Sequence, residues 1–118
     1  MELRNPIDKV PDDMVILAVS NSYEKKYYLD EEFSDLPSQI KDELKIMCVL
    51  YTEEIGGILT LMFDKEGNLN FLVSAKETDA FFDDIGSELK IRKIRKDKRE
   101  FLSSLEKYYR VVYLGEEL

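Results

Sequence analysis

The side chains of this chain that could carry chemistry are mainly carboxylates, and they are densest after residue 76. Twelve residues contain five of them: Glu77, Asp79, Asp83, Asp84 and Glu88. On a helix, Asp79 and Asp83 would share one face and could hold a hard cation such as magnesium. Magnesium is usually shared with a substrate phosphate, however, and the chain has no glycine-rich phosphate loop. We interpret the cluster as a charged first helical turn without a metal. An enzyme that holds a metal with Asp79, Asp83 and Asp84 is the alternative.

Two residue types that serve many enzymes are absent or nearly absent. The chain has no histidine, which removes the usual general base near neutral pH and the imidazole ligands of metal sites. It has one cysteine, Cys48, which excludes an internal disulfide and a cysteine-cluster zinc site within one chain. Cys48 lies in an apolar run, so we expect a buried, inert thiol. The sequence therefore predicts no cofactor and no enzymatic activity.

A basic stretch stands out in a chain whose net charge is −8. Residues 90–110 contain nine basic and three acidic side chains, a net charge of +6, which leaves −14 for the remainder. On a helical wheel, the apolar residues share one arc and the opposite face is basic. That face comprises Arg92, Lys93, Lys96, Arg99, Lys107 and Arg110.

The basic face has two interpretations. A row of cations can contact the phosphates of a nucleic acid. No aromatic side chain is interleaved on this face to stack on bases, and the acidic remainder would repel a polyanion. We therefore favour a solvated face, or one that meets carboxylates of this chain or of an acidic protein. Salt-sensitive oligonucleotide binding, lost when Arg92, Lys96 and Arg99 become glutamate, would favour nucleic acid instead.

The elements that position these groups begin with a hairpin and a helix. Residues 14–29, MVILAVSNSYEKKYYL, predict two short strands around the turn-prone Asn21–Ser22. A helix follows, with Ser34 or Asp35 as its N-cap and Gly56 as its C-cap. A strand over residues 46–52 is the alternative to the middle of this helix.

The second half of the chain repeats this order of elements. Two alternating strands, Gly57–Phe63 and Leu69–Ala75, flank a short loop with a glycine. After a break or kink at Gly86, a long helix is expected from about Ser87 to Tyr113. The predicted fold is an α+β two-layer domain, in which a four-stranded antiparallel sheet made of two hairpins packs on two main helices in β-β-α-β-β-α order.

Four residues of the predicted helices do not fit a single buried stripe. Ile46, Val49 and Leu50 lie off the apolar stripe of the first helix, so its middle is apolar nearly all round. Such a helix is central, or a partner chain covers its second side. Lys98 interrupts the apolar seam of the second helix, where it either fixes the register of a packed seam or reaches water. We predict these four residues as contacts to an oligomer or partner.

Six tyrosines lie near the two ends of the chain. Tyr23, Tyr27 and Tyr28 belong to the first hairpin, and Tyr108, Tyr109 and Tyr113 end the last helix. If the hairpin packs beside that helix, they could wall one pocket. Core filling with solvent-facing hydroxyl groups is the commoner arrangement.

One domain is expected over residues 14–118, after a flexible N-terminal tail over residues 1–13. The longest apolar runs have six residues, far short of the ~20 that cross a bilayer. The first residues carry charges where a signal peptide needs an apolar core. We therefore expect a cytoplasmic protein without a membrane contact.

Several stretches resemble a known group of sequences. They are NSYEKKYYLDEEF, ELKIMCVLYTEEIGGILTLMFDKEGNL, FFDDIGSELKI and LEKYYRVVYLG, which together cover most of the chain after Val15. In them the chain resembles a family of small uncharacterised proteins, a domain of unknown function, from Gram-positive anaerobic bacteria. The resemblance implies a compact cytoplasmic bacterial domain and carries over no catalytic residue, ligand or partner.

These observations favour a small non-enzymatic module that associates with itself or with another protein. The apolar sides of the first helix and the strong charge polarity are the reasons. The alternative is a nucleic-acid-associated protein that uses the basic face.

Overall fold

The fold is known from a computed structural model that describes residues 10–117. Residues 1–9 of the predicted N-terminal tail, residues 1–13, lie outside the described residues. The elements follow the order β1, β2, a 3₁₀ helix η2, α1, β3, β4, α2 and α3. The predicted α+β fold with a four-stranded antiparallel sheet is confirmed, with its last helix in two pieces.

The sheet has the strand order β2-β1-β3-β4, and every pairing is antiparallel. The strands are β1 (Val15–Asn21), β2 (Lys26–Leu29), β3 (Ile58–Phe63) and β4 (Leu69–Ser74). Gly57 and Ala75, which were predicted as strand ends, lie just outside β3 and β4. The central β3 is buried along its whole length, as its sequence ILTLMF, apolar except for Thr60, favours.

The first helix, α1 (Ser38–Ile55), includes residues 46–52, so the alternative strand there is wrong. The predicted N-cap at Ser34 or Asp35 is wrong too, because α1 begins only after Pro37, whose backbone is extended. The chain before it forms η2 (Glu31–Phe33), in which the Asp30 carboxylate accepts a hydrogen bond from the Glu32 backbone N–H. Gly56 ends α1, as predicted.

The predicted long helix is two helices, α2 (Asp84–Asp97) and α3 (Arg99–Val112). The chain bends at Lys98, whose φ of −110° and ψ of 23° are not helical. A straight helix would carry Lys98 into the apolar seam, whereas the bend lets its ammonium group pair with Glu43 of α1 at 3.6 Å. Gly86, predicted to break the chain, lies inside the first turn of α2.

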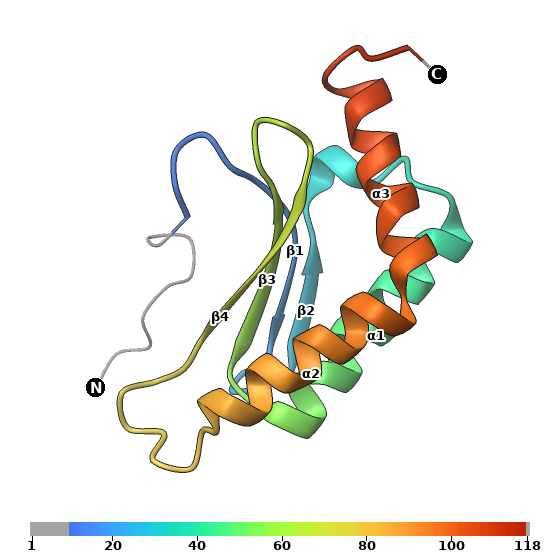
Figure 1. The fold of residues 1–118 in the computed structure, drawn as a ribbon. Coiled ribbons are helices and arrows are strands. Elements are labelled where there is room, and N and C mark those ends of the chain that lie inside the picture. Colours follow the sequence, from blue (N-terminus) through green and yellow to red (C-terminus); the bar gives the residue numbers. More distant parts are fainter. Residues whose placement is uncertain (1–9, 118) are drawn as a thin grey trace.

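All three α-helices cover the same face of the sheet (Figure 1). The core between the two layers is built around Leu17, Leu44, Tyr51, Leu61 and Leu105, which are almost completely buried. An aromatic group closes one end, where Phe63 stacks on Tyr109 of α3 with ring centroids 4.2 Å apart. Tyr113 extends this stack and donates a hydrogen bond to the Glu32 backbone carbonyl, which ties α3 to η2.

The connection from α1 to β3 needs two glycines. Gly56 and Gly57 have φ values of +87° and +72°, in the left-handed region that other residues rarely adopt. A Cβ atom on Gly57 would also lie 2.8 Å from the Phe82 ring and 2.8 Å from the Ser74 carbonyl oxygen. This turn therefore places α1 directly against the sheet.

Candidate functional site

The two sides of α1 differ in their surroundings although both carry apolar side chains. Leu44, Cys48 and Tyr51 face the sheet and have no exposed surface. Ile46 and Leu50 lie on the opposite side of the helix and are 58% and 57% exposed. Two of the three apolar residues that lie off the single stripe, Ile46 and Leu50, therefore face outward, where no described residue covers them.

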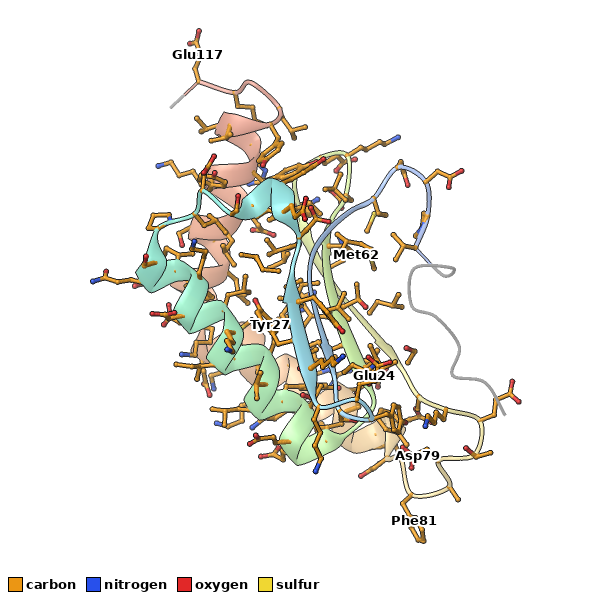
Figure 2. The ribbon with its side chains drawn as sticks, turned by 180° about the vertical axis from the view of Figure 1, so that it is seen from behind. Glu24, Tyr27, Met62, Asp79, Phe81 and Glu117 are labelled. Atoms are coloured by element: carbon orange, nitrogen blue, oxygen red, sulfur yellow. The ribbon has the colours of Figure 1, made fainter. Side chains whose placement is uncertain are left out.

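The second helix repeats this arrangement. Ser87 and Ile94 of α2 are buried, whereas Ile85 and Leu89 are 72% and 58% exposed on the opposite side. Phe81, in the loop that precedes α2, points away from the body of the protein (Figure 2). We use the term outer surface for the exposed sides of α1 and α2 that carry Ile46, Leu50, Ile85 and Leu89.

Polar contacts hold these two helices side by side. The Tyr51 and Ser87 hydroxyl groups form a buried hydrogen bond of 2.5 Å. Lys90 of α2 pairs with Glu54 of α1 at 3.2 Å, and this pair is partly exposed. Because both helices rest on the same face of the sheet, their outward sides belong to one side of the molecule (Figure 1).

The two helices differ in charge. The helix α1 has four acidic and two basic side chains, and α2 has five basic and three acidic ones. The exposed Asp42 and Glu53 lie beside the apolar residues of α1, and Arg92 and Lys96 lie beside those of α2. The outer surface therefore has an acidic half and a basic half.

The predicted basic face does not form one row. Arg110 donates hydrogen bonds to the Glu66 carbonyl and to the side chain of Asn68, so it holds the β3–β4 hairpin. Lys93 pairs with Asp97 at 2.9 Å, and this hydrogen bond raises the pKa of Lys93. The bend at Lys98 separates Arg92 and Lys96 on α2 from Arg99 and Lys107 on α3. Of the six predicted residues, two are thus engaged with neighbours in the same chain.

The residues predicted as partner contacts lie in three places. Ile46 and Leu50 belong to the outer surface. Val49 is half-buried and lines a cleft between α1 and the β1–β2 hairpin. Lys98 lies at the bend between α2 and α3 and is about two-fifths exposed, so it reaches water beside Glu43.

The predicted carboxylate cluster does not form a shared helical face, because α2 begins only after Asp79 and Asp83, and these two carboxylates have structural partners. Asp79 lies in the loop before α2, near the β1–β2 turn that carries Glu24 (Figure 2), and accepts a hydrogen bond of 2.6 Å from the Tyr23 hydroxyl. Burial, and then this hydrogen bond, raise the pKa of Tyr23. Asp83 caps α2 by accepting from the Gly86 N–H at 2.9 Å. Among residues 10–117 no group of three potential ligands could hold a metal ion.

The six tyrosines do not share a pocket. Tyr23 bonds to Asp79, Tyr27 packs toward α1, and Tyr113 stacks on Tyr109 at the far end of the core. The first hairpin packs beside α1, so the condition for one shared tyrosine pocket is not met. None of the described helices is long and apolar enough to cross a membrane.

Ile85 and Leu89 are the members of the outer surface that sequence reasoning missed. The predicted helix began at Ser87, so Ile85 was assigned to a connector. A signal was present, because Asp83 is a residue type favoured at N-caps and Asp84 puts a further carboxylate in the first turn. A helix started at Asp84 puts Ile85 and Leu89 opposite Ile91 and Ile94.

Comparison with known proteins gives a family and no function. No curated protein and no solved structure matched the chain. A family model described as a family of unknown function, DUF6145, matches residues 14–117. The match covers the whole sheet and all the helices, including both halves of the outer surface. The chain belongs to the DUF6145 family.

Proposed function

We propose that this protein is a non-enzymatic module that associates with a second copy of itself through the outer surface. The observation that carries the proposal is the exposure of four large apolar side chains by more than half on two adjacent helices. Soluble monomers rarely expose groups of such side chains, and exposed apolar groups with a polar rim mark protein interfaces. Ile46, Leu50, Ile85 and Leu89 would form the centre of the interface.

The charges around these residues fit a symmetric pair. In a twofold arrangement the same surface is used on both copies, and α1 of one copy can lie against α2 of the other. The acidic rim of α1, Asp42 and Glu53, then meets Arg92 and Lys96 of the second copy. Opposite charges across an interface fix its register and favour encounter. The uneven charge of the two helices thus supports a second copy as the partner.

Sedimentation equilibrium over a range of concentrations tests the proposal. We expect the wild-type chain to approach twice its monomer mass of 13.8 kDa at about 100 µM, a concentration at which even modest affinities populate a dimer. The double variant Ile46→Glu, Leu50→Glu should weaken association by at least about 30-fold, because it buries two carboxylates in an apolar contact. Circular dichroism should show the fold unchanged, since both positions are exposed in the single chain.

A matched control separates the outer surface from apolar exposure in general. Val112, near the end of α3, is 56% exposed and lies outside the outer surface. Val112→Glu should therefore leave association unchanged. The proposal would be refuted by a wild-type chain that stays monomeric, or by a Val112→Glu variant that associates as weakly as the double variant.

We also propose, from the sequence and the family resemblance, that the chain is a cytoplasmic protein of Gram-positive anaerobic bacteria. A nucleic-acid-associated role is less well supported than self-association, because Arg110 and Lys93 are engaged within the chain and the bend at Lys98 divides the basic face.

A further inference from the structure

A cleft of about 670 Å³ opens between α1 and the β1–β2 hairpin, on the flank of the molecule beside the outer surface. Three lysines line it: Lys25 and Lys26 from the hairpin, and Lys45 from α1. Its wall includes Ser20 and Thr52, whose hydroxyl groups hydrogen-bond to each other at 2.8 Å. The volume lies in the range of sites that hold small molecules. We call this site the lysine cleft.

Charge distinguishes the lysine cleft from the other clefts of similar size. Its three lysines face one carboxylate, Glu53, in a chain whose net charge is −8. The cleft between β4 and α2 is lined by Asp84, Glu88 and Arg92, and the cleft at the α2–α3 bend mixes both signs. The three ion pairs in the described part of the chain all use other lysines. The lysine cleft is therefore a place where cations collect without protein partners.

A second observation concerns Tyr27, which also lines the cleft and lies on the side of β2 that faces α1 (Figure 2). Its hydroxyl group is buried and has no hydrogen-bond partner in the described chain. Burial, and to a smaller extent the nearby Cys48, raise the pKa of Tyr27, so the hydroxyl keeps its proton and remains a donor. A buried donor without an acceptor destabilises the folded chain. The cleft therefore has an unpaired donor behind its Tyr27 wall.

From these features we infer that the lysine cleft binds a small phosphorylated molecule through Lys25, Lys26 and Lys45. Lysine is a compact point charge with three donors and is a regular phosphate ligand. The residues that line the cleft include three lysines and no arginine. The site contains none of the four apolar residues of the outer surface and shares Glu53 with its acidic rim.

Isothermal titration with pyrophosphate, at constant ionic strength, tests the inference. We expect the wild-type chain to bind pyrophosphate with a Kd of about 1 mM or lower. The double variant Lys26→Ala, Lys45→Ala should bind at least about tenfold more weakly, because charge-assisted contacts are the main attraction. Both lysines are exposed, so the variant should fold normally.

The control variant is Lys65→Ala, Lys107→Ala, which removes the same charge from exposed positions outside the cleft. It should bind pyrophosphate as the wild-type chain does. No measurable binding by the wild-type chain, or an equal loss in both double variants, would overturn the inference, because equal losses mean general attraction to charge.

Discussion

Leu44 and Leu50 have the same side chain on the same helix and opposite surroundings. Leu44 is completely buried against the sheet, whereas Leu50 is 57% exposed. One face of a four-stranded sheet can cover only one side of α1, so the apolar side chains on the other side exceed what this domain can bury. The helix α1 thus carries two apolar faces: one closes the core of the chain, and the other is exposed and is the face that we propose for self-association.

Substitutions on the two faces of α1 should differ strongly in their effect on the free energy of unfolding. Leu44→Ala should lower the free energy of unfolding by about 2–5 kcal/mol, because it opens a cavity in the core. Leu50→Ala should change it by less than about 0.5 kcal/mol, since the side chain is already in contact with water. Urea unfolding measures both values at a protein concentration low enough to keep the chain monomeric. Equal losses from the two substitutions would show that Leu50 belongs to the core.

A smaller loss of stability is expected at high pH, because Cys48 lies on the buried face of α1. Burial raises the pKa of Cys48 from its ordinary value of 9.0 to about 12. Above pH 9 the unfolded chain therefore releases the thiol proton while the folded chain keeps it, so stability is complete below pH 9 and falls as the pH rises toward 12. The contribution of this group should fall by up to about 1.4 kcal/mol per pH unit.

Urea midpoints between pH 8 and pH 10.5 measure this slope. The control is Cys48→Ala, in which the loss of stability with pH should be shallower than in the wild-type chain. Identical slopes for the two chains would mean that the thiol is not held in its neutral form. Alkylation of the native thiol should likewise be slow until the chain unfolds, because Cys48 has no exposed surface.

The sequence predicted the fold well where the residue pattern was local. The short apolar runs at residues 58–63 and 69–74 and the glycine in the loop between them identified the second hairpin within one residue. The 3.6-residue stripe of Leu44, Cys48 and Tyr51 identified the inner face of α1. These patterns follow from burial against a layer of the same chain.

The remaining features depend on contacts between distant parts of the chain. The bend at Lys98 brings its ammonium group beside Glu43, which lies 55 positions earlier. The role of Asp79 depends on Tyr23, in the first hairpin. The lysine cleft joins Lys25 and Lys45, which become neighbours only when the hairpin packs beside α1. No spacing along the chain indicates such pairs in advance.

Disulfide cross-linking is the sharpest test of self-association through the outer surface. The chain's own cysteine is buried, so a new exposed cysteine is the one that reacts. A tagged Leu50→Cys chain is mixed with an untagged Leu89→Cys chain and oxidised gently, and the linked pairs are separated on a non-reducing gel. Val112→Cys, also at an exposed apolar position, replaces either partner as the control. If α1 of one copy lies against α2 of another, the mixed pair of Leu50→Cys and Leu89→Cys should form well ahead of every pair that includes Val112→Cys. Cross-linking no faster than that of the control would contradict an interface at the outer surface.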